Sequence, residues 1–295
     1  MILNRLLDKV ADTIERTEAL DKPSEALAAV WNKVLSPQPV VDVLSGTPIG
    51  HPLHPLLVTV PIGAWSSAVV FDLVGDEDGA RRLTGLGLLA AVPTALAGWS
   101  DWRYTTGGER RLGLVHATSN AVAISAYGLS WLARRRGKKV SGIVWSAVGG
   151  SVLGVGGWLG GHLSYALGVG VDTTAFQHAA DDWTEVLPTD QVQAGSLTGA
   201  DVAGVPLVLT RDPAGRVVAL ADRCTHRGAP LHEGELEDGC IVCPWHSSAF
   251  ELDGGVARGP ASRPQPAYEV QERDGRVWVR RSTETHGLRT NPAGV

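Results

Sequence analysis

The strongest constraint on the fold is a series of four apolar stretches in the first part of the chain. They span residues 55–74, 83–99, 114–132 and 140–171. About 20 apolar residues suffice to cross the hydrocarbon core of a bilayer. The last three stretches contain no Asp, Glu, Lys or Arg, whereas a helix at a soluble protein's surface shows a polar stripe. The pattern therefore predicts four transmembrane helices, and the alternative is a soluble bundle of buried helices.

The fourth stretch is rich in glycine, and the segment that precedes the first stretch is not apolar. Small residues four positions apart, as in Gly150/Gly154 and Gly157/Gly161, let membrane helices approach closely. Residues 1–35 are charged and amphipathic, without the apolar core of a signal peptide. We expect a surface helix there, broken near Pro23, that lies on the membrane face or in solvent.

Four crossings would divide the loops between the two sides of the membrane. The N-terminal tail, the 101–111 loop and the C-terminal region share one side, and the 75–82 and 134–139 loops share the other. The short loops carry more Lys and Arg, which favours placing them in the cytoplasm and the C-terminal region outside. The residues counted are Arg81, Arg82, Arg134, Arg135, Arg136, Lys138 and Lys139 against Lys33, Arg103, Arg110 and Arg111.

Four histidines are predicted to lie at one face of this bundle. His51 and His54 precede or begin the first helix, His116 lies in the first turn of the third, and His162 lies near the end of the fourth. Given four crossings, all of them share the side of the C-terminal region. Two histidines on facing helices can ligate a b-type haem or another metal. The alternative is a polar or quinone-contacting cluster.

Three short motifs in this half resemble a bacterial membrane domain of unknown function. They are the HPxxHP-like run Gly50-His51-Pro52-Leu53-His54-Pro55, the run Gly98-Trp99-Ser100-Asp101-Trp102, and Gly160-Gly161-His162-Leu163 followed by Gly168-Val169-Gly170-Val171. The resemblance covers about residues 40–175 and implies four helices and membrane residence. We therefore expect an amphipathic segment at 1–40 and a four-helix transmembrane domain at 41–175.

The C-terminal half is predicted to be an all-β domain at residues 182–281, followed by a tail at 282–295. Short β-branched runs occur at 205–209, 217–221, 240–243 and 277–279. Turn sequences separate them, such as Asp-Gly at 238–239 and at 274–275. The whole chain is thus predicted to be an α + β two-domain protein.

Two loops of this half carry the chemistry. Cys224-Thr225-His226 and Cys243-Pro244-Trp245-His246 each supply one thiol and one imidazole. Two thiolates suit one ferric ion, and two neutral imidazoles on a second iron raise the potential of the pair. A structural zinc site is the alternative, but zinc fingers keep their cysteines together and their histidines together, and here they alternate.

The flanks of both loops resemble Rieske proteins over about a hundred residues. The matching runs are His226-Arg227-Gly228-Ala229-Pro230-Leu231, Ser247-Ser248-Ala249-Phe250 and Gly259-Pro260-Ala261. The resemblance implies a [2Fe–2S] cluster held by Cys224, His226, Cys243 and His246.

The resemblance also distinguishes between Rieske subtypes. Ala229 and Trp245 stand where the proteins of cytochrome bc complexes carry a disulfide clamp, so the loops look like those of Rieske ferredoxins. Ser248 matches a serine donor to the cluster, and Phe250 replaces a tyrosine donor, which implies an intermediate potential. Trp245 is expected to shield the cluster as a second-shell residue. Cys240 is expected to be a buried small hydrophobe.

Ser247 departs from the family because it replaces the glycine usual after the second histidine. The departure concerns the conformation of that loop.

The predicted function is that of an electron-transfer component rather than a stand-alone enzyme. Only the 282–295 tail follows the β domain, so no mononuclear iron oxygenase domain is expected. The formal net charge of −5, without a basic stripe, argues against nucleic acid as a partner. The expected partners are the lipid bilayer, a redox protein and a membrane redox partner, which is a quinone, a haem or an oxidoreductase. The alternatives are a redox-sensing membrane protein and the ferredoxin component of an oxygenase system.

Overall fold

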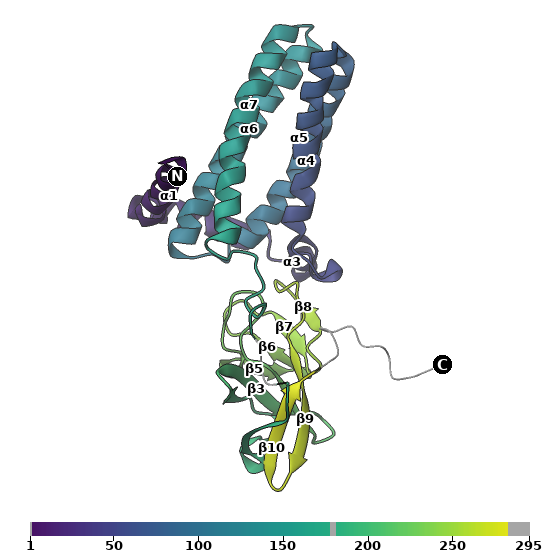
Figure 1. Ribbon diagram of the computed structural model, residues 1–295. Coiled ribbons are helices and arrows are strands. Elements are labelled where there is room, and N and C mark those ends of the chain that lie inside the picture. Colours follow the sequence, from purple (N-terminus) through teal and green to yellow (C-terminus); the bar gives the residue numbers. More distant parts are fainter. Residues whose placement is uncertain (1, 178–180, 283–295) are drawn as a thin grey trace, which may run out of the picture. The chain divides into compact units, whose positions relative to one another are not determined.

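The computed structural model describes residues 2–177 and 181–282, and it divides the chain into two compact units (Figure 1). The helical unit comprises Met1–Ser36 and Pro52–Val169, and the β unit comprises Pro37–His51 and Gly170–Val295. A helical N-terminal region and a C-terminal β region were both predicted from the sequence. Most of the predicted 282–295 tail lies outside the described residues.

Four long helices make up most of the helical unit. Each predicted apolar stretch begins inside one of them, although the fourth helix ends before the predicted end at residue 171. The helices form two antiparallel hairpins, α4–α5 and α6–α7, which pack side by side (Figure 1). The four are α4 (Leu53–Val74), α5 (Glu77–Trp102), α6 (Gly107–Arg135) and α7 (Lys139–Tyr165).

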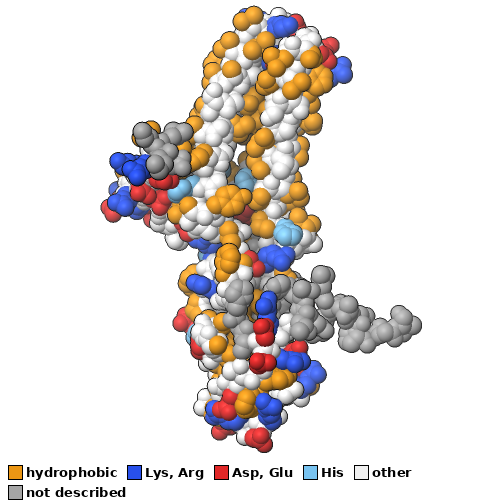
Figure 2. Space-filling model, viewed as in Figure 1, with side chains coloured by type: hydrophobic (Ala, Val, Ile, Leu, Met, Phe, Trp, Pro, Cys, Tyr) orange, Lys and Arg blue, Asp and Glu red, His pale blue; other side chains and the backbone are white. Residues whose placement is uncertain are grey.

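Three of these helices, α4, α5 and α7, are long and apolar enough to cross a membrane. In α6, by contrast, apolar residues alternate with hydroxyl and amide side chains such as Thr118, Asn120 and Ser130. Figure 2 shows hydrophobic side chains along the outer surface of the long helices, with charged side chains gathered at the hairpin tips. Contact with water is unfavourable for an apolar surface of this kind, whereas contact with lipid chains is favourable.

A buried ion pair joins the two hairpins at the end where α4 finishes. Arg134 Nη1 and Nη2 each donate to one carboxylate oxygen of Asp72 at 2.6 Å. The side chains are only 3% and 9% exposed. Arg134 therefore lies in the last turn of α6, inside the bundle, and not in a loop as its sequence position had indicated.

The N-terminal segment packs as two helices with a break between them. These are α1 (Ile2–Arg16) and α2 (Asp21–Val34). The break falls at Thr17–Leu20 and not at Pro23, because proline is accommodated in the first turn of α2. Arg111 of α6 holds the break by donating to both carboxylate oxygens of Asp21 at 2.6 Å.

Two antiparallel sheets make up the β unit. The larger has the order β1-β10-β9-β4-β3-β2, and the smaller has the order β5-β6-β7-β8. Val208 and Leu220 of the larger sheet pack with Ile241 and Phe250 of the smaller in one apolar core. The strands are β1 (Thr184–Pro188), β2 (Thr198–Val202), β3 (Val205–Arg211), β4 (Val217–Ala221), β5 (Glu235–Glu237), β6 (Cys240–Val242), β7 (Ala249–Glu251), β8 (Val256–Arg258), β9 (Ala267–Arg273) and β10 (Arg276–Arg281).

A short helical segment from before the first long helix also belongs to the β unit. It contains α3 (Gln38–Ser45) and the 3₁₀ helix η2 (Thr47–Ile49). Asp42 Oδ1 accepts from the Gly259 amide at 2.8 Å, and Thr47 Oγ1 donates to the Ala261 carbonyl at 2.9 Å. This segment therefore supports the 259–261 loop, which in turn contacts the second of the two candidate ligand loops.

Candidate metal centre

The two candidate ligand loops have the same backbone geometry. The first follows β4, and the second joins β6 to β7. In each loop the cysteine amide donates to the carbonyl five residues later, Ala229 at 2.9 Å and Ser248 at 2.8 Å. The cysteine carbonyl accepts from the amide four residues later, Gly228 at 2.8 Å and Ser247 at 3.1 Å. Each loop is thus a closed turn that aims its thiol and its imidazole in a fixed direction.

The four predicted ligands come together as two pairs. Cys224 and Cys243 are buried, with 0% and 2% exposed, and their thiols hydrogen-bond to each other. The rings of His226 and His246 lie 5.1 Å apart between centroids, at 79°. In the described part of the chain, no three His, Cys, Asp or Glu side chains converge as a single-ion site requires. The two-and-two arrangement fits a two-iron cluster with thiolates on one iron and imidazoles on the other.

Backbone amides surround both sulfurs. The amides of His226 and Arg227 donate to Cys224, and those of Trp245 and His246 donate to Cys243. Such donors stabilise negative charge on sulfur. The hydrogen bond from Cys224 lowers the pKa of Cys243 to about 6, while the same bond and burial raise the pKa of Cys224.

His226 is held in its neutral form. Burial, reinforced by the neighbouring His246, lowers the pKa of His226 to about 3. A neutral imidazole is the form that binds metal. The residues present therefore fit a Rieske cluster.

Gln265, which was not predicted from the sequence, fixes the backbone of the first ligand loop through hydrogen bonds. Its amide nitrogen donates to the carbonyls of Ala221 and Arg223 at 2.6 Å, and its amide oxygen accepts from the Thr225 amide at 3.1 Å. The side chain is fully buried. A glutamine among turn residues carries no spacing signal, so only the fold reveals this role.

The two residues predicted to tune the cluster are both buried beside the second loop. Ser248 Oγ accepts from the Ala261 amide at 2.9 Å, which leaves the hydroxyl hydrogen available to another acceptor. Phe250 packs in the apolar core and is 0% exposed. Trp245, by contrast, is 55% exposed, with its ring 6.4 Å from that of His246. It presents an indole face next to the imidazole pair.

Ser247 explains how this loop keeps its shape without the usual glycine. It adopts a left-handed conformation with φ 59°, and Gly228 occupies the equivalent place in the first loop with φ 78°. A residue with a Cβ pays about 1–2 kcal/mol for that conformation. The loop is therefore preserved at a local energetic cost.

The bundle histidines divide into different environments. His54 and His116 lie close together, with ring centroids 6.5 Å apart. His162 instead faces the N-terminal helix, with Nε2 3.3 Å from Glu15 Oε1. His51 is exposed and belongs to the β unit. Cys240 lies partly buried in β6, apart from the ligand pairs.

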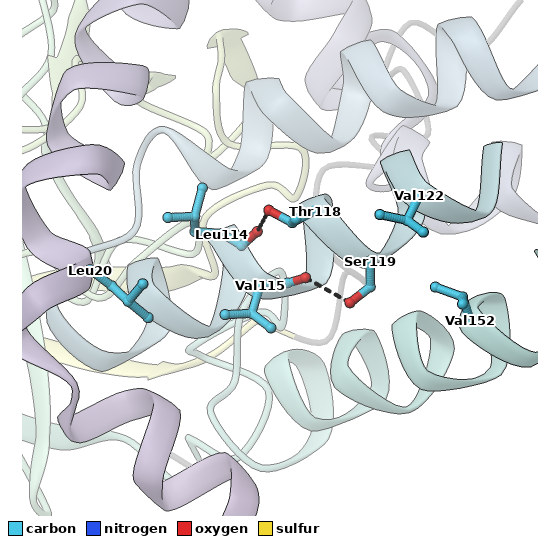
Figure 3. A pocket seen from close by; sticks show the side chains of 7 residues that line it. All are labelled: Leu20, Leu114, Val115, Thr118, Ser119, Val122 and Val152. Carbon is cyan, nitrogen blue, oxygen red and sulfur yellow. Dashed lines mark hydrogen bonds between the residues drawn. The ribbon is translucent and has the colours of Figure 1, made fainter. Parts of the chain in front are cut away.

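One cavity of about 360 Å³ opens on the helical unit, and none of these residues lines it (Figure 3). Its wall is mostly apolar, because Thr118 and Ser119 direct their hydroxyls back to the carbonyls of Leu114 and Val115. Such a lining suits a lipid chain better than a polar substrate. The lining residues are Leu20, Leu114, Val115, Thr118, Ser119, Val122 and Val152.

Comparison with known proteins matches each half of the chain to a different family. Residues 182–269 match the Rieske [2Fe-2S] domain, and residues 50–173 match the predicted membrane protein family DUF2231. The vanillate O-demethylase oxygenase subunit of Pseudomonas sp. (strain ATCC 19151) is 44% identical over 78 residues, which are 25% of this chain and 24% of that protein. Protein TIC 55 of Arabidopsis thaliana is 37% identical over 117 residues, 35% of this chain and 22% of that protein.

Among solved structures, apo dicamba monooxygenase is 31% identical with a TM-score of 0.33, over 35% of this chain and 34% of that one. The chain spans about a quarter of the length of the curated relatives that it matches. The likeness to these relatives therefore concerns one domain. The chain therefore carries a Rieske [2Fe–2S] domain at residues 182–269 and a region at residues 50–173 that matches the predicted membrane protein family DUF2231.

Proposed function

We propose that this protein is a membrane-anchored electron carrier, in which the Rieske domain exchanges single electrons with a redox protein. The observation that carries the proposal is the pairing of thiol with thiol and ring with ring in one chain with apolar helices. The bound cluster supplies one-electron acceptance and donation. The protein fixes the ligands, excludes water from the sulfurs and presents one face to a partner.

The solvent exposure of the side chains around the cluster site indicates which face the Rieske domain presents to a partner. Both cysteines are buried, whereas Trp245 stands more than half exposed beside His246. Exposed aromatic side chains are enriched at protein interfaces. A redox protein would therefore dock over Trp245 and the imidazole edges, where the path to the metal is short.

Four crossings are proposed because α6 accompanies α7 along its length. His116 near the start of α6 contacts Gly156, and Ser130 near its end donates to Gly142 at 2.7 Å. A helix packed along a membrane-spanning partner crosses the same hydrocarbon layer. The polar side chains of α6 are satisfied within the bundle, as membrane helices require.

With four crossings, the N-terminus and the Rieske domain share one side of the membrane. The excess of Lys and Arg in the 75–82 and 134–139 loops supports a cytoplasmic location for those loops. The Rieske domain is accordingly proposed to be extracytoplasmic, near a quinone pool or a membrane oxidoreductase that donates to it.

A second candidate is the ferredoxin component of an oxygenase system. It is favoured by the similarity of the Rieske domain to oxygenase subunits. In that role the electrons would pass to an oxygenase, and a quinone would not be needed. A redox-sensing role is the third candidate.

The test is to reduce the full chain in lipid nanodiscs and to follow the Rieske EPR signal after adding an oxidised quinone or a soluble redox protein. Reoxidation by either one, slowed in the Trp245→Ala variant with the protein acceptor, supports the carrier role. A signal that neither acceptor quenches contradicts it. A matched control is Trp183→Ala, a change far along the sequence from the ligand loops.

A further inference from the structure

The two hairpins of the helical unit are repeats of one another. Equivalent positions of the two hairpins are 62 residues apart, which is also the separation of Asp72 and Arg134. His54 recurs as His116, and Gly98 recurs as Gly160. Further identical pairs are Val60/Val122, Ile62/Ile124, Ala64/Ala126, Gly75/Gly137 and Gly87/Gly149. Because both repeats run in the same direction, they are related by a two-fold axis parallel to the helices.

Equivalent residues of the two repeats touch each other at three levels. The histidine rings are 6.5 Å apart, and the rings of Trp65 and Tyr127 stack at 4.0 Å with 7° between their planes. Asp72 and Arg134 form the buried ion pair. A residue that contacts its own equivalent lies on the symmetry axis. The histidine pair thus lies on this axis, in the half of the bundle where α4 and α6 begin.

Both histidines are held in the same way by the second helix of their own hairpin. His54 Nδ1 lies 2.9 Å from the Thr94 carbonyl, and His116 Nδ1 lies 2.8 Å from the Gly156 carbonyl, with 40 residues between partners in each case. A carbonyl only accepts, so each Nδ1 carries the hydrogen and each neutral ring keeps its lone pair on Nε2.

Glycine makes this seating possible. A Cβ at Gly98 would lie 2.9 Å from the His54 ring, and a Cβ at Gly160 would lie 2.9 Å from the His116 ring. Each ring therefore packs directly against a glycine of its partner helix, with no room for a side chain at that position. Fixing Nδ1 on a backbone carbonyl is the usual way of orienting a histidine that binds metal through its other nitrogen.

Asn120 does not occupy the lone pair of His116. Its amide nitrogen is 3.1 Å from Nε2 and 3.4 Å from Nδ1. A donor aligned with the Nε2 lone pair would be much farther from Nδ1 than from Nε2. The amide therefore lies against the face of the ring and not along the Nε2 lone pair.

From this geometry we infer that His54 and His116 are the axial ligands of a b-type haem on the axis between the two hairpins. Two imidazoles on opposite sides of one metal, with bonds of about 2 Å, place their ring centroids about 6 Å apart. The observed separation is 6.5 Å, and the ring planes lie at 81°. Figure 2 shows an opening between the hairpins in which histidine side-chain atoms are visible.

A haem fits better than a bare ion because the protein offers only two ligands at this place. Among the described residues, no three His, Cys, Asp or Glu side chains gather around one point. A porphyrin supplies four more nitrogens and an apolar plate that suits a helical bundle. The inference rests on the proposed function only in requiring a folded membrane domain, and it gives the bundle a redox centre of its own.

The experiment is to express the full chain with haem precursor supplied, purify it in detergent, and measure haem by pyridine haemochrome absorbance. We expect one haem per chain with a low-spin, six-coordinate spectrum. Either His54→Ala or His116→Ala should lower the haem content about tenfold or more. The matched controls His51→Ala and His162→Ala should keep it.

A folding defect is separated from a ligand defect by chemical rescue. The His54→Gly variant should recover a low-spin spectrum when imidazole is added, and the His162→Gly variant should not change. The Rieske EPR signal, measured on the same samples, should be equal in all variants. Its loss from every sample would count against the proposed electron-carrier function and not against the haem site. Absence of haem after reconstitution with haemin, haem retained in both alanine variants, or one equivalent of copper or zinc without a Soret band would overturn the inference.

Discussion

The Rieske loops and the histidine pair of the bundle are two candidate metal-binding geometries that the sequence records in different ways. In the loops, a cysteine and a histidine lie two or three residues apart, so each loop holds a pair of ligands by local turns. In the bundle, each histidine stands alone, and its partner comes from the equivalent position of a repeat. Local spacing reveals the first kind of site, and internal symmetry reveals the second.

The largest effect should separate the two sites completely. Cys224→Ser should abolish the Rieske EPR signal, because a hydroxyl does not replace a thiolate as a ligand to iron. The haem proposed at the histidine pair should be unaffected. The Soret absorbance of the same sample measures it. Cys240→Ser, the matched control in the neighbouring strand, should keep the full signal. Full intensity in the Cys224 variant would remove that residue from the ligand set.

The converse change should damage the bundle and spare the cluster. Asp72→Ala leaves the buried Arg134 guanidinium without its counter-charge, which should cost about 3–5 kcal/mol of stability. The measurement is unfolding of the helical unit in detergent, with the Rieske signal as a reference. The double variant Asp72→Ala/Arg134→Ala should recover part of the loss. A single variant as stable as the parent would mean that the pair is solvated.

A smaller effect concerns the tuning of the cluster by the second loop. Ser248→Ala should lower the reduction potential, because it removes a hydroxyl donor that favours the more negative reduced form. One hydrogen bond of about 1 kcal/mol corresponds to roughly 40 mV for a one-electron couple. Redox titration followed by EPR measures it, and Ser196→Ala, in an exposed turn, is the control.

Phe250→Tyr should raise the potential if the added hydroxyl reaches the position of the family's tyrosine donor. If both potentials stay unchanged, the alignment of this loop with the high-potential family is incorrect.

The smallest effect compares the two ligand loops with each other. Ser247→Gly should stabilise the β unit by about 1 kcal/mol, because glycine adopts the left-handed conformation without strain. Gly228→Ser, the reciprocal change in the first loop, should destabilise by a similar amount. Thermal unfolding of the loaded protein measures both, and a destabilising Ser247→Gly would show that the side chain has another role.

The sequence was most informative where structure is local. The runs at 205–209, 217–221, 240–243 and 277–279 all lie in or overlap strands, and Asp238 and Asp274 turn their hairpins with φ 50° and 52°. The spacing of the cysteines and histidines indicated the cluster domain because both ligands of each loop share one turn.

Long-range contacts were the part that the sequence did not yield. Gln265 accepts a hydrogen bond from a backbone amide 40 residues away in the sequence, and no local sequence pattern indicates this contact. In the sequence, Arg134 looks like a charged loop residue beside two other arginines, yet it pairs with Asp72, which is 62 residues away. The four bundle histidines were grouped by helix direction alone, whereas the ring contacts separate His162, which faces Glu15, from the His54–His116 pair. The internal repeat was the signal that would have paired those two residues.

We propose a Rieske cluster and a membrane anchor in one chain, and one measurement tests for both. Membranes from cells that express the full chain are washed with alkaline carbonate, reduced with dithionite, and examined by EPR. We expect a Rieske signal of about one cluster per chain that remains in the membrane pellet and is absent for Cys224→Ser. A Rieske signal that appears in the carbonate wash, or a membrane-bound chain without any such signal, would contradict it.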